Sequence, residues 1–204
     1  MANLNCPNCG GAIEGISPLI RSIDCPYCSS WLRLSNQLWQ ANEGQRAPLD
    51  APTFLHVGMG GGAPDGTYYT IRGRLRFQYG MGSWDEWWMD DSHGQSFWLE
   101  EDDGAYYRHS LGEEVSVAGG ISSISVGGTL ALRDGPTLFV TEKYQADIVG
   151  REGMLPVEPE AETTVYYVDG VENGEEYSLE IEGEYASISQ SEAFDIRAIK
   201  WDKA

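Results

Sequence analysis

The chain has 204 residues, 41% hydrophobic and 11% aromatic, so it can bury a core in one or two domains, and it contains no apolar run long enough to span a membrane. The formal net charge is −19: residues 47–133 hold 5 basic and 12 acidic residues and residues 134–204 hold 5 and 17, whereas residues 1–46 are balanced. A body this acidic repels phosphate backbones and anionic lipid, which argues against nucleic acid as a partner.

Four cysteines near the start of the chain form two Cys-x-x-Cys pairs with fifteen residues between them. Each pair makes a tight turn, and two such turns place four sulfurs around one Zn²⁺ with no coordination position left open. We therefore predict a zinc ribbon over residues 1–35 that holds one structural zinc ion through Cys6, Cys9, Cys25 and Cys28. An iron–sulfur or rubredoxin-like iron site uses similar ligands and is the alternative.

The first residues carry neither the charged segment nor the apolar segment of a secretory signal, so we expect a cytoplasmic protein with reduced cysteines. After the ribbon, residues 36–52 are polar and contain two prolines. This composition predicts a linker, with the body starting at Thr53.

The body is predicted to contain two diverged copies of one antiparallel β unit, residues 53–125 and 126–204. Val57-Gly58, Asp65-Gly66 and the strand that starts at Tyr69 all recur 69 residues later. Two further pairs of segments align after a longer insertion in the second copy: Trp87–Asp90 with Tyr166–Asp169, and Phe97–Glu100 with Tyr177–Glu180. Chance similarity between β-rich segments is the alternative.

Strand patterning is clear from Tyr69 to Phe77, where residues 69, 71, 75 and 77 are apolar and the residues between them polar. Gly73 falls on the apolar face, which indicates a bulge or a large facing side chain such as Trp. Hairpins are expected at Asp91–Gly94 and Glu101–Gly104. The second copy has Asp169-Gly170 and Asn173-Gly174 in the first of these places. The predicted fold is mainly β: a small zinc ribbon followed by a tandem-repeat antiparallel sheet or barrel-like body.

Catalytic residues are hard to find in this sequence. Glu86 and Glu100 lie on neighbouring predicted strands and could form a carboxylate pair of the glycosidase type, but 32 acidic residues produce such pairs by accident. His56, His93 and His109 are scattered, and no Ser or Cys partner is recognisable. We therefore expect no enzyme, with a hydrolase or transferase built from carboxylates as the alternative.

Two groups of side chains are candidates for binding a partner. Arg72, Arg74 and Arg76 form a basic stripe that binds an anionic group or, as we favour, pairs across the sheet with acidic neighbours such as Glu86 or Glu100. Trp84 and Trp88 belong to a cluster in which Trp87 and Trp88 must point to opposite faces. One of these rings is either an exposed anchor for a partner or packed between the two copies.

Several segments resemble an uncharacterised bacterial family, domain of unknown function 4178. They are the strand around Gly73, Trp84-Asp85-Glu86-Trp87, Phe97-Trp98-Leu99, and Gly153-Met154-Leu155-Pro156 after Thr141-Glu142, and they cover most of residues 55–190. The resemblance implies a tandem β module with no assigned activity, often preceded by a zinc ribbon, and an accessory role in a membrane-proximal, multi-protein system. The family usually has an acidic residue where this chain has Met154, so any chemistry of that acid should be absent here.

Together these observations predict a non-catalytic zinc-binding interaction or scaffold protein that acts as an accessory subunit of a bacterial system. Its expected partners are proteins, basic or membrane-associated, with no nucleic acid and no transmembrane segment. The acidic body would steer a basic partner, although solubility alone explains the charge equally well.

Overall fold

The computed structural model describes residues 2–42, 49, 53–133, 135–159 and 163–203. The N-terminal part has five strands: β1 Ala2–Asn5, β2 Ala12–Ile16, β3 Ser22–Asp24, β4 Trp31–Ser35 and β5 Leu38–Asn42. The body has twelve: β6 Gly60–Gly62, β7 Tyr68–Tyr79, β8 Gly82–Asp91, β9 Ser96–Asp102, β10 Ala105–His109, β11 Glu113–Ser116, β12 Thr129–Ala131, β13 Thr137–Leu155, β14 Thr164–Glu172, β15 Glu175–Glu182, β16 Tyr185–Ala193 and β17 Lys200–Trp201. Two short 3₁₀ helices, η1 Gly120–Ser123 and η2 Ile196–Ala198, complete the described part, and the mainly β prediction is confirmed.

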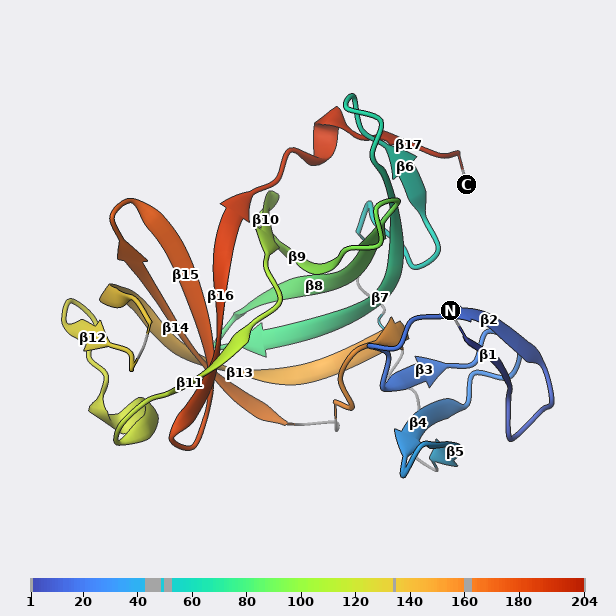
Figure 1. Ribbon diagram of the computed structural model, residues 1–204, viewed down its shortest axis with the longest axis horizontal. Helices are drawn as coiled ribbons and strands as arrows, with labels where there is room; N and C mark the ends of the chain where they lie inside the picture. Colours follow the sequence, from blue (N-terminus) through green and yellow to red (C-terminus); the bar gives the residue numbers. More distant parts are fainter. Residues whose placement is uncertain (1, 43–48, 50–52, 134, 160–162, 204) are drawn as a thin grey trace.

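Eight strands of the body close into an antiparallel barrel (Figure 1). The order around it is β7-β8-β9-β10-β16-β15-β14-β13, and β13 pairs back to β7. Neighbours in sequence are joined by hairpins, whereas the β10–β16 and β7–β13 seams join segments far apart in the chain. Closure gives each of these strands a partner on both sides, although β13 pairs with β14 over Phe139–Asp147 and with β7 over Asp147–Gly153.

The barrel consists of two four-stranded meanders, β7–β10 and β13–β16, each entered from a short strand, β6 or β12. The two entry hairpins have equivalent hydrogen bonds. The Gly58 amide donates to the Ile71 carbonyl, and the Gly127 amide donates to the Val140 carbonyl, which is the predicted offset of 69 residues. One alignment changes, because Met89 lies opposite Ile71 and Gly170 opposite Val140, so Met89 corresponds to Gly170 and not to Val168. Two copies of one unit would have this common strand order and these equivalent hydrogen bonds. The internal repeat itself stays a prediction.

A β-bulge in β7 exchanges the two faces of the strand, so apolar residues before and after it pack on opposite sides of the sheet. The pairing of β7 with β8 shifts between Ile71 and Gly73, so the bulge predicted at this glycine is present. All four apolar residues of the predicted pattern are buried, but the extra residue turns the strand over. Ile71 packs in one core cluster and Phe77 in another, on opposite faces, whereas the sequence pattern had placed them together.

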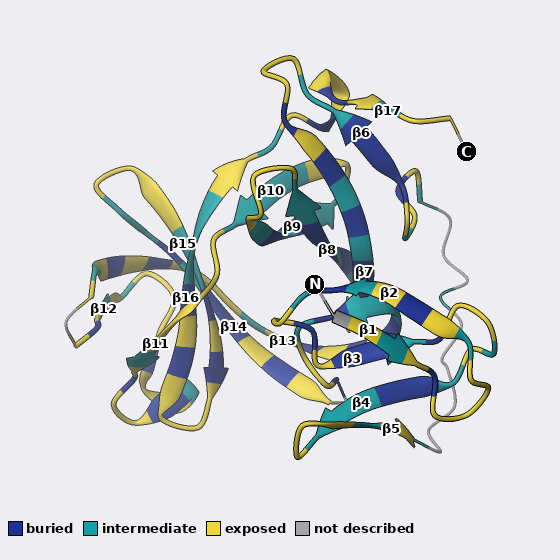
Figure 2. Cartoon of the chain, turned by 45° about the vertical axis from the view of Figure 1, so that its right-hand side comes forward, coloured by how far each residue is buried: buried dark blue, intermediate teal, exposed yellow. Residues whose placement is uncertain are grey.

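Three apolar clusters result, and buried residues alternate with exposed ones along the strands (Figure 2). One fills an end of the barrel around Phe77 and Trp88. The outer wall carries the other two: one is covered by the segments around Leu55 and Ile196, the other by the β11–η1–β12 segment with Val117 and Leu132. Because apolar groups cover the outer wall, polar residues of the inner face are left to line the remaining interior.

The ribbon rests on the barrel through the long strand β13. Its last residues, Met154 and Leu155, pair with Ile23 and Ser22 of β3, so one sheet runs from barrel to ribbon (Figure 1). The ribbon's sheet continues to Asn42, past the predicted boundary at residue 35, because β5 pairs with β4. Residues 43–48 and 50–52 of the predicted linker lie outside the described residues, and the proposed domain boundaries stay a prediction.

The glycine at position 73 is required by this junction. A Cβ there would lie 2.3 Å from the Met154 carbonyl oxygen of β13, and Trp88 is the residue paired with Gly73 on β8. The hairpins at Asp91–Gly94 and Glu101–Gly104 form as predicted. Of the two places predicted in the second meander, Asn173-Gly174 forms a turn and Asp169-Gly170 lies within β14. Within the described ranges, no helix is long and apolar enough to cross a membrane.

Candidate metal centre and barrel cavity

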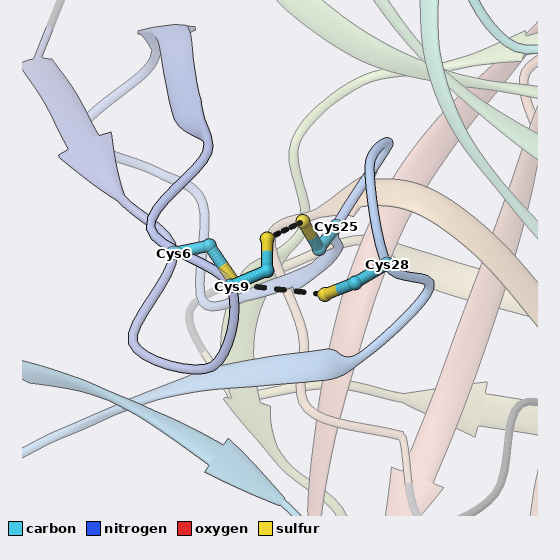
Figure 3. Close-up of side chains that lie close together, drawn as sticks. All are labelled: Cys6, Cys9, Cys25 and Cys28. Atoms are coloured by element: carbon cyan, nitrogen blue, oxygen red, sulfur yellow. Dashed lines mark hydrogen bonds between the residues drawn. The ribbon is translucent and has the colours of Figure 1, made fainter.

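The four predicted zinc ligands converge at one point of the ribbon (Figure 3). All four Sγ atoms lie within 4.8 Å of one another, and the Cys6–Cys28 and Cys9–Cys25 sulfurs are each 3.8 Å apart. Four sulfurs arranged tetrahedrally about 2.3 Å from Zn²⁺ are separated by about 3.8 Å. The donor set and its spacing therefore fit a tetrahedral metal ion.

The two turns that present these cysteines are built alike. The Gly10 amide donates to the Cys6 carbonyl and the Ser29 amide to the Cys25 carbonyl, both at 2.8 Å. Gly10 and Ser29 have positive φ angles of 77° and 57°, which the tight turn imposes after its second ligand. The direction of every sulfur is thus set by hydrogen bonds within its own turn.

The barrel contains a cavity of about 660 Å³ that is open to solvent. Its lining comes from all eight barrel strands and from the loop residue Val126; the polar and aromatic members that matter here are Tyr79, Trp84, Glu100, Asp102, Tyr107, His109, Glu142, Lys143, Tyr144, Asp169, Glu176 and Ser191. A smaller compartment of about 110 Å³ adds Glu86, Trp98, Tyr167 and Glu180. Trp84, Glu100, His109 and Tyr144 line both compartments, which are therefore adjacent.

The structure brings together the predicted carboxylate pair. Glu86 and Glu100 are directly opposite each other on β8 and β9, and both line the smaller compartment. Burial, with the charges of Glu180 and Glu100, raises the pKa of Glu86 to about 8, although nearby His109 opposes the shift. Burial likewise raises the pKa of Asp169 to about 6 and that of Glu180 above its ordinary value.

His109 belongs to a constellation that sequence reasoning missed. Its Nε2 lies 3.0 Å from Glu100 Oε2, and its Nδ1 lies 3.1 Å from Ser191 Oγ. Burial alone would lower the pKa of His109, but its hydrogen bond to Glu100 and the surrounding carboxylates raise it overall. His109 and Ser191 are 82 positions apart and meet only because β10 pairs with β16, so no local signal could have found them.

Aromatic rings form one wall of the cavity. Tyr144 and Tyr167 stack with centroids 5.4 Å apart, and the Trp84 ring meets each of them edge to face. Trp84 also donates from Nε1 to Glu86 at 3.2 Å, and the Tyr167 hydroxyl lies 3.5 Å from the same carboxylate. The wall is thus a rigid surface that carries carboxylate oxygens between its rings.

The comparisons place the barrel in a known family. The sequence profile described as "Domain of unknown function (DUF4178)" matches residues 62–196, well over half of the chain. The chain belongs to this family. Comparison with curated proteins and with solved structures found no match. The DUF4178 region starts at the end of β6 and ends at η2, so it contains every strand that lines the cavity, and the cysteines lie outside it.

The predicted basic stripe of the DUF4178 region is neutralised within the sheet. Arg74 makes two 2.8 Å bonds to Asp85, and Arg76 makes another. Arg72 pairs with Asp90 at 2.9 Å. Pairing across the sheet was expected, but the partners are Asp85 and Asp90, because the β7–β8 register places Glu86 on the opposite, inner face.

The predicted aromatic anchors are buried. Trp84 is 5% and Trp88 0% exposed, so neither offers a surface for a partner protein; Trp84 borders the cavity instead. The Gly153-Met154-Leu155-Pro156 segment of the DUF4178 region forms the junction with the ribbon, where Met154 packs against the core cluster shared by ribbon and barrel. Met154, where the resemblance led us to expect an acidic residue, lies outside the residues that line the cavity.

Proposed function

We propose that this chain is a non-catalytic zinc-binding protein of the cytoplasm whose barrel cavity receives a small ligand. One observation carries the proposal: residues from all eight strands line a cavity of about 660 Å³. Ligand pockets typically have volumes of about 300–1,000 Å³, and eight-stranded barrels are wide enough to hold one small ligand. Polar groups on rigid strands, set beside aromatic rings, are the usual composition of such a site.

A cavity-filling substitution tests the binding function. Ser191 faces the cavity and Glu192, its neighbour on β16, is exposed on the outer side. A thermal-shift screen of cationic, neutral and anionic metabolites on the full chain should find ligands that raise the melting temperature. Ser191→Trp should abolish that rise and Glu192→Trp should leave it intact. Ligands that stabilise Ser191→Trp equally well would show that the cavity is not the site.

The sulfur geometry supports zinc as the metal in the ribbon. A site of four thiolates has no open position, so it stabilises the fold and performs no chemistry. Metal analysis of the full chain should give about one zinc per chain and a colourless protein. A red, iron-containing product would favour the rubredoxin-like alternative.

We further propose that the protein is an accessory subunit that contacts a basic protein partner and does not bind nucleic acid. The support is electrostatic: the body carries the whole net charge of −19, and the arginine stripe is paired with aspartates. Nucleic-acid affinity depends on a cationic surface that releases counterions. A gel shift at low salt should therefore show no complex with DNA or RNA, and a retained shift would contradict this proposal.

A hydrolase is the second candidate, and the Glu100–His109–Ser191 constellation favours it. Ser191 has a histidine within hydrogen-bonding distance, and that histidine has a carboxylate partner, as nucleophilic catalysis requires. Ser191 lies inside strand β16, however, where backbone amides are used in the sheet and are not free to stabilise an oxyanion. Fluorophosphonate labelling of Ser191 that is lost in His109→Gln would establish a hydrolase, and no labelling is expected.

A further inference from the structure

We propose that the cavity ligand is a linear amine with at least two positive charges. The inference rests on the proposed ligand-binding function and names the chemical class that the cavity recognises. Three features of the cavity carry it: its charge, the distribution of that charge along two compartments, and its aromatic wall.

The cavity has a large excess of carboxylates. The described residues that line its two compartments include seven acidic side chains: Glu86, Glu100, Asp102, Glu142, Asp169, Glu176 and Glu180. The basic ones are Lys143 and His109. The Lys143 ammonium is turned away, because it donates at 2.8 Å to the carbonyls of Ile121 and Ile124 in the outer η1 segment. His109 is held by Glu100, so among the described residues no cation is paired with the remaining cavity carboxylates.

The carboxylates are spread along the cavity and are not gathered at one point. Glu86 and Glu180 belong to the smaller compartment, whereas Asp169 and Glu176 belong to the larger one. Across the described residues, the cysteines are the one group of three or more potential ligands close enough to hold a metal ion. A single metal ion would therefore leave most of this charge uncompensated, whereas an elongated molecule with separated ammonium groups can reach both compartments.

The wall between the charges suits the carbon chain of such a molecule. Trp84 and Tyr144 line both compartments, and Trp98 and Tyr167 line the smaller one. Ammonium groups are attracted to the faces of aromatic rings, and methylene groups gain contact area against them. The Tyr167 and Trp84 polar atoms already lie next to Glu86, so rings and carboxylate would meet the same ligand segment.

Binding of such a cation is linked to proton release. Glu86 is faced by groups from every neighbouring element: Trp84 beside it, Glu100, His109, Tyr144, Tyr167 and Glu180. Because burial and like charges raise the pKa of Glu86 to about 8, its carboxyl is largely protonated at neutral pH. An ammonium group beside it favours the ionised form, so affinity should increase as the pH rises towards about 8 and then level off.

Calorimetry on the full chain tests the inference with spermidine, putrescine and n-butylamine at physiological salt. Spermidine and putrescine should bind at one site, and n-butylamine, with the same kind of chain but one charge, at least about tenfold more weakly. Glu180→Gln should weaken spermidine at least about tenfold. Glu192→Gln removes the same charge from the outer side of β16 and should change affinity less than twofold. Glu86→Gln should weaken the dependence of affinity on pH between neutrality and pH 8, and titration of His109 accounts for what remains.

Four outcomes would overturn the inference: equal affinity for n-butylamine and spermidine, equal weakening by Glu192→Gln and Glu180→Gln, equal competition by Mg²⁺, or no amine binding at all. Melting curves of each variant identify a folding defect, and Glu180, whose side chain is solvent-accessible in the cavity, provides a variant with little structural risk. If the screen finds neutral or anionic ligands that Ser191→Trp excludes, the proposed binding function stands and this inference alone fails.

Discussion

The junction between ribbon and barrel gives the sharpest prediction about stability. Leu155 is 1% exposed and packs in a cluster that contains ribbon residues such as Ile23 and barrel residues such as Leu75. Truncating a buried Leu to Ala costs about 2–5 kcal/mol, depending on how well the site collapses. Gly73 is a direct neighbour of Leu155, because a Cβ built on it would lie 2.7 Å from Leu155 Cδ2. Glycine has no side chain that could move into the space left by the truncated leucine. We therefore expect Leu155→Ala to cost about 4 kcal/mol.

The assay combines thermal melting with release of zinc to a chelator. For a chain of this length, about 4 kcal/mol corresponds to a fall in melting temperature of roughly 10 °C. If about 2 kcal/mol of the lost stability comes from weaker packing of the ribbon on the barrel, zinc release should become about thirtyfold faster. Leu138→Ala is the matched control, because Leu138 is 0% exposed on the same strand but packs in the cluster under η1.

Leu138→Ala should lower the melting temperature comparably and leave zinc release unchanged. Unchanged release in Leu155→Ala would refute the reasoning, because the ribbon would then be independent of the barrel. Equal acceleration in both variants would also refute it, since release would then require global unfolding.

Three further predictions follow from single side chains. Cys25→Ser should abolish zinc binding in metal analysis and lower the melting temperature of the barrel, because Cys25 belongs to the shared cluster; an unchanged barrel transition would contradict this. Asp85→Asn removes the carboxylate shared by Arg74, which is 3% exposed and keeps Glu152 at 3.9 Å, and Arg76, and should cost about 3–5 kcal/mol in urea unfolding; a loss under 1 kcal/mol would show that the pairs are not structural. Folded Glu86 has a pKa of about 8 against an ordinary 4.5, so the folded state keeps a proton that the unfolded state has lost, and stability should fall as pH rises between these values. Glu86→Gln should flatten that fall, and an equally steep profile in the variant would contradict the assignment.

The features predicted correctly from sequence depend on residues close together in the chain. The clustering of the four cysteines follows from two Cys-x-x-Cys turns, whose geometry is complete within five residues. The alternation in β7, the hairpins at Asp91–Gly94 and Glu101–Gly104, and the adjacency of Glu86 and Glu100 follow from the period of a strand and the position of a turn. The errors also have local causes: one extra residue at the bulge moved Phe77 to the other face from Ile71, and a shift of one position gave the arginines Asp85 instead of Glu86.

The sequence by itself determined the four-cysteine cluster, the β class, the strand faces between bulges and the acidic character of the body. Only the tertiary structure decided that the two meanders close into a barrel, because the β7–β13 and β10–β16 seams join segments that no local pattern links. Closure converts polar positions that would face solvent on an open sheet into the lining of a cavity, and places Ser191 beside His109. The chemistry of that cavity depends on long-range pairing, whereas the metal site depends on spacing along the chain.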